Sequence, residues 1–168
     1  MDSIKLRIAG TVNDSIVDGE GFRYTIFTQG CPHNCPGCHN PQTHSFSGGY
    51  MSDIQTLLKE ILSNPLLSGV TFSGGEPFCQ PEALVVLAKT LHEHQLDIWC
   101  YTGYTYETLL KEADPQKMAL LREVDYLVDG PYIEAQRDLT IDFRGSCNQR
   151  IIDVKASLNH NRIVLYTP

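Results

Sequence analysis

Three of the six cysteines lie within one short segment, as Cys31, Cys35 and Cys38. Glycine and proline stand between and beside them, and glycine lets a backbone wrap closely around a bound group. Thiolate sulfur is a soft ligand that selects zinc or an iron–sulfur cluster. The spacing therefore predicts a metal centre held by a loop.

The residues alone leave the identity of this centre open. Structural zinc would need a fourth ligand, which His33, His39 or His44 could supply. A ferredoxin-like cluster uses four cysteines, and no fourth cysteine lies in the same segment. In a reducing cytosol, cysteines are better explained as ligands or reactive thiols than as disulfides. Of the other three cysteines, we expect Cys100 to be buried and inert. Cys79 could approach the edge of the metal centre, and Cys147 is assigned no role.

Composition limits the class of protein. The chain has 168 residues, of which 42% are hydrophobic, and this predicts a single globular domain over residues 1–168. With a net charge of -7, the chain lacks the excess of basic residues that nucleic-acid binding usually requires. No apolar run approaches the roughly 18 residues needed to span a bilayer. We expect a cytoplasmic protein that binds neither nucleic acid nor a membrane.

Strands and helices alternate along the chain. A helix is expected after residue 52, where Ser52 and Gln55 form a capping box, and another begins at Pro81. Helical sequence over residues 105–123 is interrupted at Asp114, a predicted N-cap before a proline. Apolar alternation and short apolar runs predict strands over residues 4–8, 24–28, 70–72, 98–101, 126–128, 151–154 and 163–166.

This alternation predicts an α/β fold. Strands that take turns with helices imply right-handed βαβ units and a mostly parallel sheet. Because the chain is shorter than the roughly 200 residues of a full eight-stranded barrel, we expect an open or partial (βα) barrel. Ligands bind such sheets at the carboxyl ends of the strands. The loops after Thr28, Phe72, Tyr101 and Val128 all leave from that edge.

Several segments together carry a family resemblance. The cysteine motif resembles that of the radical S-adenosylmethionine enzymes. Residues 17–23 (VDGEGFR), 27–31 (FTQGC) and 38–41 (CHNP) are similar to the opening of the glycyl-radical-enzyme activases, and residues 73–77 (SGGEP) resemble the Gly-Gly-Glu element of the superfamily. Residues 128–132 (VDGPY) and 143–153 (FRGSCNQRIID) are similar to the activases of anaerobic ribonucleotide reduction.

The resemblance implies an enzyme with two cofactors. Cys31, Cys35 and Cys38 would hold three irons of a 4Fe-4S cluster, and the fourth iron would stay open for S-adenosylmethionine. The residues implied in contact with that cofactor are Gly74, Gly75 and Glu76 at its methionyl end, Gly37, Cys38 and His39 near its adenine, and Asp129 at a strand end. For Asp129, capping of the turn before Gly130 is an equally good interpretation.

The implied reaction is reductive cleavage of S-adenosylmethionine and removal of a hydrogen atom from a partner protein. The partner would be the large subunit of the anaerobic ribonucleoside-triphosphate reductase, which accepts a glycyl radical. A low-potential donor such as flavodoxin would supply the electron.

Three alternatives remain open. Two are other radical S-adenosylmethionine enzymes, pyruvate formate-lyase activase and 7-carboxy-7-deazaguanine synthase. The third is a zinc-binding module without catalytic activity.

The last part of the chain differs in charge from the rest. Residues 137–168 hold five basic and three acidic side chains, a net charge of +2, which leaves -9 for the other residues. We expect some of these arginines, with Arg144 and Arg150 as the first candidates, to dock the reductase or to bind the cofactor's carboxylate. A solvated surface is the alternative.

Overall fold

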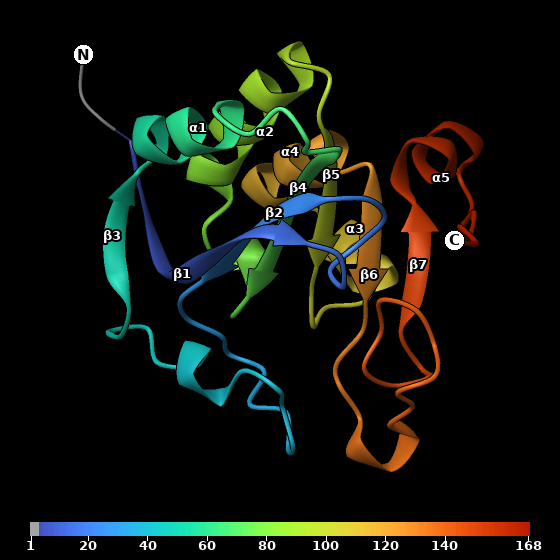
Figure 1. Ribbon diagram of the computed structural model, residues 1–168. Coiled ribbons are helices and arrows are strands. Elements are labelled where there is room, and N and C mark those ends of the chain that lie inside the picture. The colour runs from blue at the N-terminus through green and yellow to red at the C-terminus, as the bar shows by residue number, and fades with distance from the viewer. Residues whose placement is uncertain (1–3) are drawn as a thin grey trace.

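The computed structural model describes residues 4–168, so the first three residues of the predicted domain lie outside the description. One sheet of seven strands organises the chain, in the order β3-β1-β2-β4-β5-β6-β7 (Figure 1). The strands are β1 (Lys5–Ser15), β2 (Arg23–Thr28), β3 (Tyr50–Asp53), β4 (Gly69–Gly74), β5 (Asp97–Tyr101), β6 (Tyr126–Asp129) and β7 (Arg150–Asp153).

The centre of the sheet is parallel and its margins are antiparallel. Strands β2, β4, β5 and β6 run in parallel, whereas β1 and β3 on one side and β7 on the other run antiparallel to their neighbours. The order of strands begins with β3 and ends with β7, so the sheet does not close on itself. The predicted α/β fold with an open, partial barrel is confirmed.

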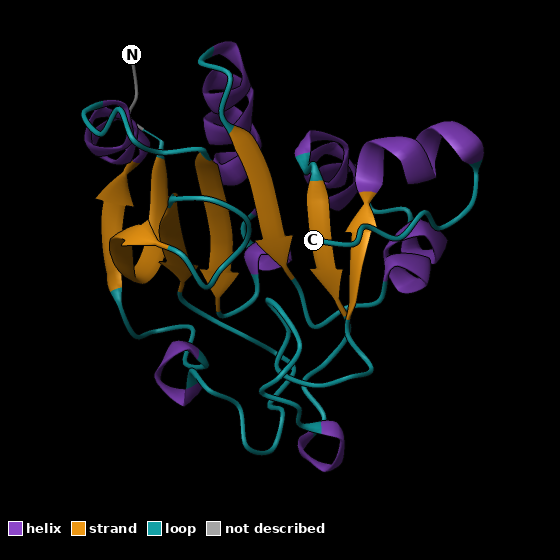
Figure 2. Ribbon diagram, turned by 45° about the vertical axis from the view of Figure 1, so that its right-hand side comes forward, coloured by secondary structure: helices purple, strands orange, loops and turns teal. Residues whose placement is uncertain are grey.

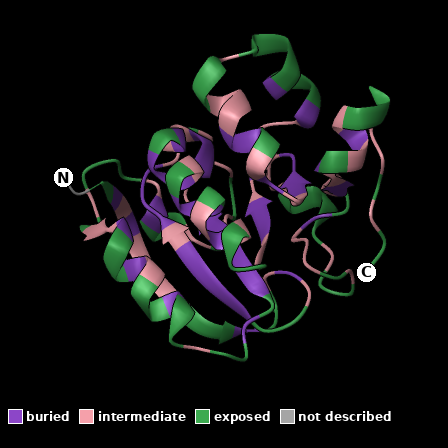
Figure 3. Ribbon diagram, turned by 90° about the horizontal axis from the view of Figure 1, so that it is seen from above, coloured by how far each residue is buried: buried purple, intermediate pink, exposed green. Residues whose placement is uncertain are grey.

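Five helices cover one face of the sheet. They are α1 (Ile54–Leu62), α2 (Pro81–Glu93), α3 (Tyr106–Glu112), α4 (Pro115–Glu123) and α5 (Val154–His160), joined by short 3-10 turns η1 (Pro41–Thr43), η2 (Pro77–Cys79) and η3 (Glu134–Gln136). Their apolar sides are buried against the strands while their outer sides stay exposed (Figure 3). No helix within residues 4–168 is long and apolar enough to cross a membrane.

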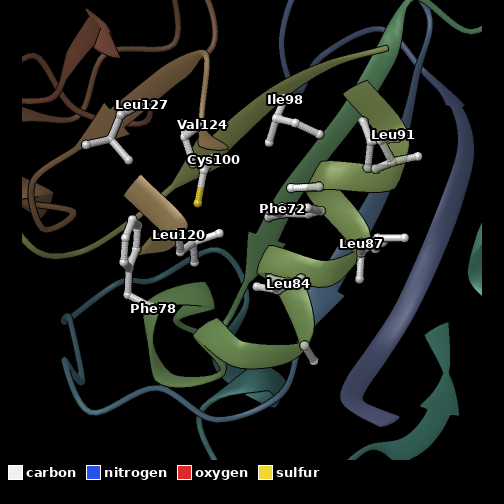
Figure 4. Packing of buried hydrophobic residues seen from close by; sticks show 14 of the residues in the cluster. Phe72, Phe78, Leu84, Leu87, Leu91, Ile98, Cys100, Leu120, Val124 and Leu127 are labelled. Atoms are coloured by element: carbon white, nitrogen blue, oxygen red, sulfur yellow. The ribbon is translucent and has the colours of Figure 1, made fainter. Parts of the chain in front are cut away.

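The main core lies between these helices and the sheet. Leu84, Leu87 and Leu91 recur at helical spacing on α2 and point toward Phe72 and Ile98 of the central strands (Figure 4). All five side chains are fully buried. Burial of this kind stabilises a fold by about 1.5–3 kcal/mol per large apolar side chain, so this layer fixes the strands whose ends carry the site.

The first helix starts one residue later than the capping box predicts. The N-cap of α1 is Asp53, whose carboxylate accepts a hydrogen bond from Gln55 N at 2.8 Å. Ser52 is not a cap, because it pairs with Leu6 in the edge strand β3, an element that the sequence analysis missed. The predicted break at Asp114 is confirmed, since its carboxylate caps α4.

The end of the chain differs from the prediction. The strand expected over residues 163–166 is reduced to one bridge between Leu165 and Ile152. The segment before it forms the unpredicted helix α5. This helix starts where the Asp153 carboxylate accepts a hydrogen bond from Ala156 N at 3.0 Å, which also ends the strand predicted to reach residue 154.

The second face of the sheet is partly polar. Arg23 is fully buried there and donates hydrogen bonds to Thr71 Oγ1 at 2.8 Å and to the Val70 carbonyl at 2.9 Å. Trp99 lies beside it, with the ring of Phe143 at 5.3 Å between centroids. The loop that carries Phe143 is therefore anchored to the inside of the partial barrel.

Candidate metal centre and cofactor cavity

The loops after β2, β4, β5 and β6 meet at the carboxyl ends of these strands, as the sequence predicts. Figure 2 shows the loops gathered below the arrowheads of the parallel strands. Between them lies a cavity of about 280 Å³. The sequence-predicted site residues that line this cavity are Cys31, Cys35, Cys38, His39, Gly74 and Gly75.

The three cysteines share the wall of this cavity, and each is half-buried. The loop that holds them is fixed at its base, where Gly30 N donates to the Thr43 carbonyl at 2.7 Å and Cys31 N to the His44 carbonyl at 3.1 Å. Burial raises the pKa of the Cys31 thiol to about 11. Since the ligand form is the thiolate, a bound metal must displace this proton.

The cysteines are the donors that an iron–sulfur cluster requires. Within residues 4–168, no three His, Cys, Asp or Glu side chains are grouped so that they could hold a single metal ion. The three thiols lie in the wall of a cavity that also has room for a ligand, and soft sulfur donors in this arrangement fit the cluster implied by the sequence.

Gly74 and Gly75 bring the end of β4 against the root of the cysteine loop. Gly74 has a φ of 92°, and a Cβ at this position would lie 2.6 Å from Thr28 N. A Cβ on Gly75 would overlap the carbonyl oxygen of Gly30. No other residue fits these two contacts, and the missing side chains leave backbone exposed to the cavity.

Glu76 lies behind the cavity wall. Its carboxylate is fully buried and accepts hydrogen bonds from Thr102 Oγ1 at 2.8 Å and from Gly103 N at 2.8 Å. His33 Nε2 lies 2.5 Å from Glu76 Oε1, and it is the His33 ring that lines the cavity. The methionyl contact expected for Glu76 therefore stays a prediction, because its carboxylate is joined to the wall through His33.

The contact between His33 and Glu76 could not be predicted from the sequence. The position of His33 between Cys31 and Cys35 suggested only a possible zinc ligand. Its contact with Glu76 depends on the parallel register that sets Thr28 opposite Gly74, and no local pattern in the sequence encodes that register.

Residues from the late part of the chain pack against Gly37. A Cβ on Gly37 would overlap the Glu134 carboxylate, which accepts a hydrogen bond from the Tyr132 hydroxyl at 2.7 Å. The ring of Tyr132 lies 4.9 Å from that of His39 and lines the cavity. Gly37 itself does not line the cavity; its expected contact with adenine stays a prediction.

Asp129 lies outside the cavity wall, and its neighbour Gly130 lines it. The buried Asp129 carboxylate accepts hydrogen bonds from Arg150 Nε at 3.0 Å and from Tyr106 N, the first residue of α3, at 2.8 Å. Hydrogen bonds to Asp129 and Glu107 raise the pKa of Arg150 above its ordinary range. The Asp129 carboxylate thus joins α3 to Arg150, a structural role other than the turn cap offered as the alternative, and its contact with the cofactor stays a prediction.

The remaining cysteines lie apart from the cavity. Cys100 is fully buried in the core, and burial raises its pKa well above the ordinary value, as expected for an inert thiol. Cys79 is half-buried and Cys147 is exposed. Neither lines the cavity.

Comparisons with known proteins first define the class. Residues 17–152 match the family described as a 4Fe-4S single cluster domain. In fold, the chain is similar to the crystal structure of QueE from Escherichia coli, with a TM-score of 0.50 and 18% sequence identity over 60% of this chain and 53% of that one. The chain is an iron–sulfur protein built on an open α/β sheet.

Relatives of higher identity then define the family. The anaerobic ribonucleoside-triphosphate reductase-activating protein of Haemophilus influenzae is 36% identical over 146 residues, which make up 81% of this chain and 90% of that protein. The protein of the same name from Vibrio cholerae is 37% identical over 81% of this chain and 90% of the relative. The one from Enterobacteria phage T4 is 33% identical over 80% and 86%.

The chain belongs to the family of the anaerobic ribonucleoside-triphosphate reductase-activating proteins. This membership confirms the resemblance on which the sequence analysis relied. It also decides between the cofactors that the cysteines alone left open, in favour of the 4Fe-4S cluster and against zinc.

Proposed function

We propose that this protein activates an anaerobic ribonucleoside-triphosphate reductase by generating a glycyl radical on its large subunit. One observation carries the proposal. Cys31, Cys35 and Cys38 share a single cavity with the Gly74–Gly75 turn, in a chain whose relatives are named for this activation. One domain holds the whole site.

In this proposal the three cysteines hold a 4Fe-4S cluster and S-adenosylmethionine binds beside it. The bound cluster, once reduced, would supply the electron for reductive cleavage of S-adenosylmethionine into methionine and a 5'-deoxyadenosyl group, the species that would remove a hydrogen atom from a backbone glycine of the partner. A low-potential donor such as flavodoxin supplies the electron.

The protein's own residues bind, orient and shield these groups. The turn at Gly74 and Gly75 offers backbone without side chains to the methionyl end, and the Glu76 carboxylate orients His33. The rings of His39 and Tyr132 lie on the side of Gly37, where the adenine binds. The loop between β6 and β7, which contributes Tyr132, Phe143 and Arg144 to the wall, closes the cavity and excludes water around the radical.

The test uses anaerobic protein reconstituted with iron and sulfide, reduced with dithionite and supplied with S-adenosylmethionine. We expect methionine and 5'-deoxyadenosine in wild type and in Cys79→Ser, and neither product in Cys31→Ser or Cys35→Ser. Addition of the reductase should give a glycyl-radical signal in electron paramagnetic resonance. Product formation by Cys35→Ser together with its loss in Cys79→Ser would overturn the ligand assignment.

A further inference from the structure

Within residues 4–168, the guanidinium of half-buried Arg144 has no carboxylate partner, in contrast to Arg23 and Arg150. Arg7 likewise forms no ion pair, but it donates to the Gly48 carbonyl and does not line the cavity. Arg144 Nε donates to the carbonyl of Asp142 at 3.2 Å, and Arg144 forms no salt bridge within residues 4–168. Arg150, the other arginine that the sequence singled out, is occupied by Asp129 and Glu107. Of these two arginines, Arg144 is therefore the one that can take a further anion.

Arg144 is also the one Lys or Arg residue in the wall of the cavity within the described chain. The other ionisable groups of this wall are the three cysteines, the carboxylate of Asp18, two tyrosines and three histidines (Tyr101, Tyr132, His33, His39 and His44). Thiolates and a carboxylate repel an anionic ligand, so any ligand anion in this cavity needs a compensating cation. Arg144 supplies it.

The turn that carries Arg144 is built to hold it in place. Phe143 has a φ of 61°, in the left-handed region that a bulky side chain rarely adopts. This conformation is secured because the Tyr101 hydroxyl donates to the Phe143 carbonyl at 2.6 Å and the Phe143 ring packs edge-on against Trp99. Strain of this kind persists only where the surroundings over-determine it.

The residues that follow close the turn from the other side. Gln149 Oε1 accepts hydrogen bonds from Gly145 N at 2.8 Å and Ser146 N at 3.2 Å, while Gln149 Nε2 donates to the Gly130 carbonyl at 3.1 Å. A Cβ on Gly145 would lie 3.0 Å from the Tyr132 ring. The backbone beside Arg144 is thus fixed to the ends of both β5 and β6.

We propose that Arg144 binds the α-carboxylate of the methionyl group of S-adenosylmethionine, an inference that rests on the proposed function. The planar guanidinium matches a carboxylate through two parallel hydrogen bonds, which a lysine cannot form. Arg144 is a positioning residue. It offsets the repulsion between the cofactor's carboxylate and the thiolate-bound cluster, and it fixes the orientation of the sulfonium.

The experiment compares two ligands that differ only in the carboxylate. Binding of S-adenosylmethionine and of decarboxylated S-adenosylmethionine to the cluster-loaded protein is measured by anaerobic equilibrium dialysis. Arg144→Gln should weaken S-adenosylmethionine binding by about 10- to 100-fold, the range for one charge-assisted pair, and change binding of the decarboxylated ligand by less than about twofold. Arg144→Lys should fall between wild type and Arg144→Gln.

Arg122→Gln is the matched control, because Arg122 is exposed on α4, and it should leave both affinities unchanged. The visible absorbance of the cluster verifies that each variant is loaded. Equal weakening of both ligands in Arg144→Gln would overturn the proposal, since the arginine would then act on the loop and not on the carboxylate. If wild type bound no S-adenosylmethionine, the proposed function itself would fail.

Discussion

The imidazole of His33 and the carboxylate of Glu76 lie 2.5 Å apart, and they come from different loops of the site. His33 belongs to the cysteine loop after β2, and Glu76 follows the two glycines that end β4. Glu76 also accepts hydrogen bonds from Thr102 and Gly103, which follow β5. A single buried carboxylate therefore joins three of the four loops that form the cavity.

Replacing this carboxylate by an amide should destabilise the protein. In Glu76→Gln, one acceptor oxygen becomes an NH2 group that faces the donors of Gly103, Thr102 or Phe78. An unsatisfied buried polar group costs about 1–3 kcal/mol, and the free energy of unfolding should fall by that amount in urea titrations of the metal-free protein. Glu112→Gln, at an exposed and loosely paired site, is the control. Equal stability of the two variants would contradict the role assigned to Glu76.

Loss of the imidazole should loosen the cysteine loop without unfolding the sheet. His33→Ala removes the link between the cysteine loop and Glu76, while the main core between helices and sheet is untouched. We expect less iron per protein after reconstitution and gel filtration than in wild type. His94→Ala, at the exposed end of α2, should retain iron fully. Full iron retention in His33→Ala would show that the backbone contacts of the loop suffice.

Gly75→Ala should disrupt the site, whereas a glycine-to-alanine substitution elsewhere in the sheet should not. The Cβ of Gly75→Ala overlaps the Gly30 carbonyl, and backbone cannot move aside as a flexible side chain can. We expect a loss of about 2 kcal/mol or more in unfolding free energy, together with impaired cluster reconstitution. Gly10→Ala on β1 meets no atom within 4 Å and should change neither quantity. If Gly75→Ala and Gly10→Ala had the same unfolding free energy and the same cluster loading, the steric explanation would be wrong.

The ion pair on the outer side of α3 should contribute to stability only above acid pH. Hydrogen bonds from Arg150 lower the pKa of Glu107 below its ordinary value of 4.5. A carboxyl group whose pKa is lower in the folded protein stabilises it above the unfolded pKa, and this contribution is lost as pH falls through the folded pKa. The stability difference between wild type and Glu107→Gln, measured in urea at pH 7, 5 and 3, should shrink at pH 3. For Glu93→Gln, an exposed residue of α2, we expect no such trend.

Much of the architecture follows from local sequence patterns. Apolar runs located the central strands because each is buried on the helical face, and the proline after Asp114 located the start of α4. The edge strand β3 escaped prediction, because two of its four residues are exposed and the other two are polar. A strand at the margin of a sheet is defined by its neighbour more than by its own pattern.

The cysteines of the site were predictable from their spacing, and the two glycines were predictable from the family resemblance. The place of His33 was not predictable, because its contact with Glu76 depends on the register of β2 and β4. The sequence offered two arginines for the cofactor's carboxylate and could not choose between them. Arg144 and Arg150 are alike in the sequence. Only the fold shows that Asp129 and Glu107 occupy Arg150 and that no carboxylate pairs with Arg144 in the described chain.

The cavity combines Cys31, Cys35 and Cys38 with Tyr132, Phe143, Arg144 and Gln149. The ribosome makes the cysteines early and the opposite wall more than ninety residues later, since position 132 lies 94 residues after position 38. A nascent chain can therefore present its thiols long before it can cover them. A cluster delivered before the segment up to β7 has folded would lack the wall that Tyr132, Phe143 and Arg144 provide, and it would be exposed to solvent.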